Sequence, residues 1–117
     1  MPTSEHGDFE EPKKSAYSVE RYDSDWERQY MLKLEKDKTV LKWTKVHGIT
    51  IEYITEAGNK RGYHPDFLIE KIDGSVELHE VKGGHFLDNP DTIRKHEAAK
   101  NWCAKRKMRF IVVTKKK

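Results

Sequence analysis

An Asp-Gly pair in the second half of the chain constrains its fold more than any other feature. Asp73 and Gly74 stand between two apolar runs, residues 63–72 and 76–82, and this dipeptide is the strongest short signal for a β-hairpin. We therefore expect the two runs to pair as antiparallel strands. Such pairing brings residues near 66 beside residues near 80, although they are far apart in the sequence.

Two helices have clear N-terminal signals. Ser24 and Glu27 form a Ser-x-x-Glu capping box, and apolar residues follow it at helical spacing. Asn89 and Pro90 read as a cap residue and a first-turn proline. We therefore expect one helix to begin at Ser24 and a second helix to begin at Asn89.

Apolar runs predict strands over residues 39–47, 49–54, 63–72, 76–82 and 109–114. Residues 1–16 have almost no apolar periodicity and are expected to form a flexible N-terminal arm, which leaves residues 17–117 for the domain. A chain of 117 residues is long enough for one core and too short for two. The order of a helix, three or four strands, a helix and a strand, which is α-β-β-β-α-β with three, predicts an α/β fold in which helices flank a mixed central β-sheet.

The composition excludes several classes of protein. A single cysteine, Cys103, excludes an intramolecular disulfide and a zinc site built from several cysteines. No apolar stretch approaches the roughly twenty residues of a membrane span, and the N-terminus has no apolar signal core. We therefore expect no membrane partner and a location in the cytoplasm.

Charge is unevenly distributed along the chain. Residues 92–117 hold ten Lys or Arg and one acidic residue, whereas residues 1–91 hold 13 basic and 19 acidic residues. The basic block indicates a polyanion such as DNA, and its alternative is an ordinary solvated helix face. The candidate phosphate contacts in this block are Lys95, Lys100, Lys105 and Arg106.

The predicted hairpin brings two carboxylates and a lysine together. Asp66 shares a face with Glu80 and Lys82 only if the numbers of opposed residues sum to an even value such as 148. We therefore expect an odd-length loop or a bulge, with Gly74 or a neighbour at positive φ. In that register Asp66 lies opposite Lys82 and beside Glu80.

Two converging carboxylates repel each other and need a cation. Hard oxygen ligands suit Mg²⁺ or Mn²⁺, and the backbone carbonyl of Val81 is a further candidate ligand. Such an ion lowers the pKa of a bound water and neutralises charge on a phosphate, while Lys82 is placed to orient that water. These residues predict a phosphodiester hydrolysis site; the alternative is a salt bridge across the hairpin.

The spacing of Pro65-Asp66 and Glu80-Val81-Lys82 resembles the motif of the PD-(D/E)xK nuclease superfamily. More narrowly, the chain resembles the N-terminal catalytic domain of TnsA-type transposon endonucleases, in residues 24–28, 61–67, 80–82 and 97–114. The resemblance implies a restriction-endonuclease-like core and a Mg²⁺-dependent endodeoxyribonuclease.

The same resemblance implies roles for single residues. Glu27, Asp66 and Glu80 match the metal-holding acids, and Lys82 matches the catalytic lysine. Arg61 lies in a matched stretch and is expected to contact DNA. For Glu27 the alternative is a purely structural role as the partner of Ser24 in the capping box.

Several functional alternatives stay open at this point. They are a nuclease of the Holliday-junction-resolvase type, a non-catalytic nucleic-acid-binding module with a decayed site, and an interaction protein. Because one site cuts one strand, a double-strand cut would need a homodimer or a partner nuclease or transposase subunit. TnsA-type proteins carry a further domain that engages a transposase, and we expect none here, which favours a small stand-alone or phage-type enzyme in a prokaryotic cell.

Overall fold

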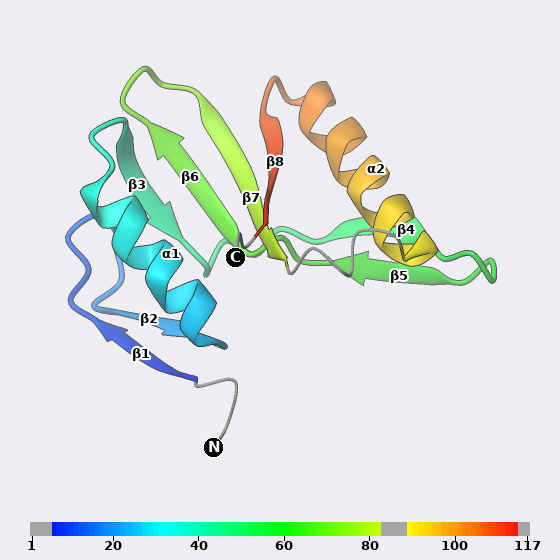
Figure 1. Cartoon of the computed structure of the whole chain (residues 1–117). Helices are drawn as coiled ribbons and strands as arrows, with labels where there is room; N and C mark the ends of the chain where they lie inside the picture. The colour runs from blue at the N-terminus through cyan, green and yellow to red at the C-terminus, as the bar shows by residue number, and fades with distance from the viewer. Residues whose placement is uncertain (1–5, 83–88, 115–117) are drawn as a thin grey trace.

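The computed structural model describes residues 6–82 and 89–114, apart from the side chain of Lys82. Its helices are α1 (Asp25–Lys36) and α2 (Pro90–Lys105). Its strands are β1 (Gly7–Glu10), β2 (Val19–Tyr22), β3 (Val40–Thr44), β4 (Ile51–Ile54), β5 (Lys60–Tyr63), β6 (Phe67–Lys71), β7 (Val76–Lys82) and β8 (Arg109–Thr114). Figure 1 shows their arrangement.

A mixed four-stranded sheet in the order β3-β6-β7-β8 forms the centre of the molecule (Figure 1). β6 pairs antiparallel with both β3 and β7, whereas β8 pairs parallel with β7. A parallel pair needs a crossover, and α2 lies in the connection between β7 and β8. The predicted α/β fold with a mixed sheet between helices is confirmed.

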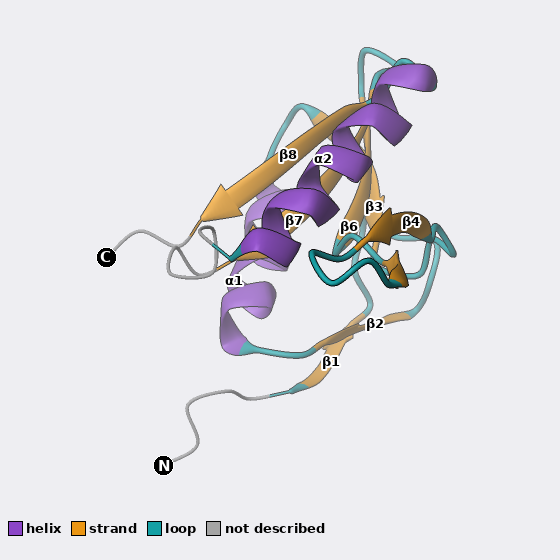
Figure 2. Cartoon of the chain, turned by 90° about the vertical axis from the view of Figure 1, so that its right-hand side faces the viewer, coloured by secondary structure: helices purple, strands orange, loops and turns teal. Residues whose placement is uncertain are grey.

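The two helices cover opposite faces of this sheet (Figure 2). Because side chains alternate along a strand, Phe67 and Ile69 of β6 lie on one face and pack in the same core as Met31 of α1. Leu78 of β7 lies on the other face and packs in the same core as Ala99 of α2. Each helix therefore covers one face of the sheet, so the hairpin β6–β7 packs against a core on both of its faces.

Both predicted helix starts are confirmed. Ser24 caps α1, and its side chain accepts a hydrogen bond from the Glu27 amide. The side-chain oxygen of Asn89 accepts hydrogen bonds from the amides of the first turn of α2, where Pro90 stands.

The hairpin β6–β7 has an even register, as expected. Leu68 pairs with Leu78, and extending this register towards the other end of the hairpin places Asp66 opposite Glu80. The expectation that Asp66 lies opposite Lys82 is therefore wrong: the residue opposite Asp66, Glu80, comes two residues earlier in the chain. The cause is the turn: the Lys71 amide donates to the Ser75 carbonyl at 2.8 Å, and Gly74 has φ 89°. Residues 72–74 thus form the odd-length loop that an even register needs.

Two expectations about other segments are corrected. The predicted strand over residues 63–72 is interrupted between Tyr63 and Phe67, because Pro65 offers no amide to a ladder. The break separates β6 from β5, which forms an antiparallel ribbon with β4 beside α2 (Figure 1).

The flexible arm expected over residues 1–16 is wrong for residues 7–10, which form β1 and pair with β2. Strand β1 has no periodic apolar pattern, because of its residues only Phe9 packs against the core, with its ring centroid 6.0 Å from that of Trp43. Neither helix in residues 6–82 and 89–114 is long and apolar enough to span a membrane.

Candidate active site

Two acidic side chains meet where β6 begins and β7 ends. Glu80 is 4% exposed, and Asp66 Oδ2 accepts a hydrogen bond from the Val81 amide at 2.7 Å. Burial, and next the charge of Glu80, raise the pKa of Asp66 to about 7. The two carboxylates are therefore close enough for the Glu80 charge to oppose the ionisation of Asp66, as the hairpin geometry predicts.

His47 fixes the chain segment that leads into Asp66. Its Nε2 donates to the Pro65 carbonyl at 2.7 Å, and its Nδ1 accepts from the Ile49 amide at 3.0 Å. Both ring nitrogens are used, so the imidazole is neutral and ties the loop after β3 to the start of β6. His47 is thus a positioning residue rather than a metal ligand.

Glu27 lies in the first turn of α1 and is 8% exposed. Its amide donates to Ser24 Oγ at 3.2 Å, while its Oε1 accepts from the Asp23 amide at 2.9 Å. The capping interpretation is therefore part of its role, with Asp23 taking the reciprocal bond. The charge of Glu27 also raises the pKa of Asp66, which brings it within electrostatic reach of the acid pair.

Lys45, at the end of β3, is a site residue that the sequence did not reveal. Its Nζ lies 2.6 Å from Glu27 Oε1 and 3.1 Å from Asp23 Oδ2. Burial opposes the charged form, but the hydrogen bonds and charges of Glu27 and Asp23 outweigh it and raise the pKa of Lys45. A lysine in a charge-rich chain gives no local signal of such a role, because its partners are about twenty residues away.

The residues of this site fit a hard divalent cation. Asp66 and Glu80 supply carboxylate oxygens, which are the ligands that such ions prefer. Asp66 and Glu80 would hold the ion, with Glu27 at the border. Within the described ranges, no group of three or more His, Cys, Asp or Glu side chains is already arranged as a metal centre.

Val81 and Lys82 complete the predicted set. The Val81 amide is used by Asp66, and its carbonyl stays a candidate ligand. Lys82 is the last residue of β7, and its side chain lies outside the described part of the structure.

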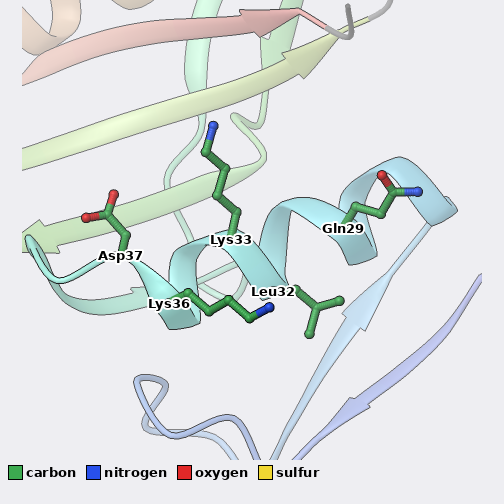
Figure 3. Close-up of a pocket in the computed structure, with 5 residues that line it drawn as sticks. All are labelled: Gln29, Leu32, Lys33, Lys36 and Asp37. Carbon is green, nitrogen blue, oxygen red and sulfur yellow. The ribbon is translucent and has the colours of Figure 1, made fainter.

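A polar hollow of about 270 Å³ opens beside Asp66, between the loop after β3 and the segment before β6. Its lining includes Asp23, Lys45, His47, His64 and Asp66. A larger hollow of about 500 Å³ lies on α1, lined by Gln29, Leu32, Lys33, Lys36 and Asp37. Figure 3 shows that these five side chains do not converge on one point, so the smaller hollow is the better candidate for substrate.

The predicted DNA contacts fall into two groups. Arg61 on β5 is exposed. Lys95 on α2 has its Nζ 5.2 Å from the ring centroid of Tyr63. Burial and the charge of Glu80 both raise the pKa of Tyr63, so this ring is close to the acid pair. Lys95 is therefore near the acid pair, and Arg61 is two residues before Tyr63 on β5.

The other basic residues, Lys100, Lys105 and Arg106, are exposed towards the far end of α2. That end leads into the start of β8 (Figure 1), whereas Glu80 is near the end of β7, to which β8 runs parallel. Arg106 also lies with its guanidinium 3.8 Å from the ring centroid of Trp102 and donates to the Trp102 carbonyl. The structure does not bring this group to the acid pair.

The mixed sheet, the two flanking helices and the acid pair at the sheet end define an α/β protein with a restriction-endonuclease-like core. Residues 37–115, more than half of the chain, match the family described as TnsA-like endonuclease N terminal. The chain belongs to this family, as its motifs indicate, and the family gives it a nuclease-related role. The matched segment contains Asp66, Glu80 and Lys82 and begins after Glu27. No curated protein matches the chain.

Proposed function

We propose that this protein is a Mg²⁺- or Mn²⁺-dependent DNA endonuclease whose site is built on Asp66, Glu80 and Lys82. The observation that carries the proposal is the buried acid pair at the end of the β6–β7 hairpin, in a chain of the TnsA-like endonuclease family. A salt bridge across the hairpin would not raise the pKa of Asp66, since a cationic partner lowers it.

Each residue has a defined task in this proposal. Asp66 and Glu80 would hold the divalent ion, and the Val81 amide keeps the Asp66 carboxylate oriented at 2.7 Å. When bound, the ion neutralises phosphate charge and lowers the pKa of a water. Lys82 orients that water or stabilises the charge that develops on the phosphate. Glu27 contributes directly or through a water, and the Val81 carbonyl is a further ligand.

DNA is the proposed substrate. Arg61 and Lys95 would contact phosphates beside the acid pair, and Lys100, Lys105 and Arg106 would extend the contacts along α2. Cutting both strands would need a homodimer or a partner nuclease or transposase subunit.

A nicking assay on supercoiled plasmid tests the proposal. With Mg²⁺, the wild type should nick, whereas Asp66→Asn and Lys82→Ala should lose most of the activity, by about 10²-fold or more. Glu70→Gln is the matched control, since Glu70 is an exposed acid on β6, the strand that Asp66 immediately precedes. Equal nicking by all four proteins would refute the assignment.

A second assay separates the enzyme from a non-catalytic DNA-binding module. Calorimetric titration with Mn²⁺ should give heat for the wild type and none for the Asp66→Asn, Glu80→Gln double variant. DNA binding that is indifferent to divalent ions, together with no Mn²⁺ heat, would favour the module. Cleavage of linear duplex, flap and four-way-junction DNA would then define the substrate class.

A further inference from the structure

Lys45 is the cation that the fold itself places at the proposed metal site. Its side chain is 15% exposed, and its Nζ lies 2.6 Å from Glu27 Oε1 and 3.1 Å from Asp23 Oδ2. A charge held this far from water is stable only while it is paired. The pair partner, Glu27, is one of the acids proposed above to contribute to the metal site, so the ammonium and the metal would have a ligand in common.

Lys45 also lies beside the acid pair. It lines the same hollow as Asp66, and its Nζ is held 2.6 Å from Glu27 Oε1. Its charge therefore offsets part of the negative charge that Asp66, Glu80 and Glu27 bring to the site. A divalent ion held by these acids would stand close to the ammonium.

The surroundings of Lys45 allow its ammonium to leave Glu27. Lys45 and Asp66 line the same hollow of about 270 Å³, which is open to solvent on one side. The lysine stem has four rotatable carbon–carbon bonds, so its head can turn into this hollow without any movement of the strand. Glu27 cannot follow in the same way, because its Oε1 is also held by the Asp23 amide at 2.9 Å.

We propose that Lys45 is a built-in counter-ion that competes with the divalent metal for Glu27. Without metal, the ammonium neutralises Glu27. When metal binds, the like charges repel each other, and the ammonium turns from Glu27 into the hollow beside Asp66. This inference rests on the proposed metal-dependent function, and it adds a residue that sets the metal affinity of the site.

Calorimetric titration of the full chain with Mn²⁺ tests the inference. Lys45→Met keeps the apolar stem and removes the charge, and Lys45→Gln keeps a hydrogen-bond donor for Glu27. Both variants should bind Mn²⁺ about tenfold more tightly than the wild type, because one like charge near the ion is gone. Lys42→Met is the matched control, since Lys42 is an exposed lysine on β3, the strand that Lys45 immediately follows. The Mn²⁺ affinity of this variant should equal that of the wild type.

The possible results separate the two proposals. Normal Mn²⁺ binding by the wild type with unchanged or weaker binding by both Lys45 variants overturns the role of Lys45 alone. Absence of Mn²⁺ binding by the wild type overturns the metal site and this inference with it.

A measurement on the wild type covers the case in which neither variant folds. The ammonium resonances of ¹⁵N-labelled lysines are followed during titration with Mg²⁺, and Lys45→Arg identifies the Lys45 signal. That signal should shift with the same midpoint as the calorimetric titration, because the ammonium leaves its carboxylate. A Lys45 signal that stays unchanged while Mg²⁺ saturates the site overturns the inference.

Discussion

The ionisation of Asp66 in the folded state lowers the free energy of unfolding, so we expect the stability of the protein to depend on pH. Its pKa rises from 3.8 to about 7 on folding, chiefly by burial and then by the charge of Glu80. An acid with a raised folded-state pKa stabilises the fold while it is protonated. That contribution is complete below about pH 4 and disappears as the pH rises through about 7.

The metal-free wild type should therefore lose roughly 2–4 kcal/mol of unfolding free energy between pH 4 and pH 8 that Asp66→Asn does not lose. Urea unfolding in the presence of a chelator, at several pH values, measures this difference. Saturating Mg²⁺ should reduce the loss, since the ion favours the ionised pair. Parallel pH profiles of the two chelated proteins would contradict the assigned shift.

His47 gives a second prediction at the scale of single residues. His47→Ala removes the bonds to the Pro65 carbonyl and the Ile49 amide, at 2.7 and 3.0 Å. We expect the free energy of unfolding to fall by about 1–3 kcal/mol, because two backbone groups lose their partner. His64→Ala is the control in thermal unfolding: His64 is exposed, and its contacts with Thr50 and Ile49 are longer, at 3.2 and 3.3 Å. An equal effect of both variants would contradict the positioning role.

These residues show which parts of the candidate site could be predicted from the sequence and which could not. The proximity of Asp66 and Glu80 could be predicted, although not their exact register, because the turn around Gly74 brings the two ends of the hairpin together. Lys45 and His47 could not, because their roles depend on how the loop after β3 meets the segment before β6. These segments extend from β3 and β6, which pair in the sheet but are separated in the chain by β4 and β5, so no hairpin signal predicts their pairing.

At the scale of elements, a buried polar contact connects α1 to β7. Tyr30 Oη and His79 Nδ1 are 2.5 Å apart, and His79 Nε2 lies 2.8 Å from Glu77 Oε1. Burial is the main cause of two pKa shifts at this contact. It lowers the pKa of His79 and raises the pKa of Tyr30 to about 12. The neutral forms are therefore favoured, with the phenol donating to His79.

This contact sets the distance between the helix that carries Glu27 and the strand that carries Glu80. Tyr30→Phe should lower the free energy of unfolding by about 1–2 kcal/mol, since His79 loses a buried partner. Tyr53→Phe, on β4 away from this contact, should change it by less than about 0.5 kcal/mol. Chemical denaturation of the two variants compares the losses, and similar values would contradict a structural role for the Tyr30 hydroxyl.

The elements themselves were predicted best where the local chemistry is specific. Ser24, Asn89 and Gly74 each satisfy a backbone requirement at a helix start or a turn, so their elements appear at the expected places. The strand β1 was missed because a four-residue ribbon that buries one Phe leaves no periodic pattern. The number of strands therefore exceeds what apolar alternation alone could predict.

At the scale of the whole molecule, the basic residues fall into a group near the acid pair and a group far from it. Lys95 lies beside Tyr63, and Arg61 is two residues before it on β5. Lys105 and Arg106 lie about 15 Å further along α2 than Lys95, at 1.5 Å per residue. The charge count of the sequence predicts a basic block, but only the fold shows that three of its four candidate contacts, Lys100, Lys105 and Arg106, are remote from the site.

DNA that lies across the acid pair should depend on the near residues. The Arg61→Ala, Lys95→Ala double variant should lower duplex affinity and reduce the slope of log K against log salt by about 2, one for each lost phosphate contact. The matched Lys105→Ala, Arg106→Ala double variant removes the same charge and should change that slope by less than about 0.5. Fluorescence anisotropy over a salt series, with inactive Asp66→Asn as the background, measures both. A larger loss from the distant pair would mean that DNA runs along α2, so that the acid pair meets it only at one end of the protein.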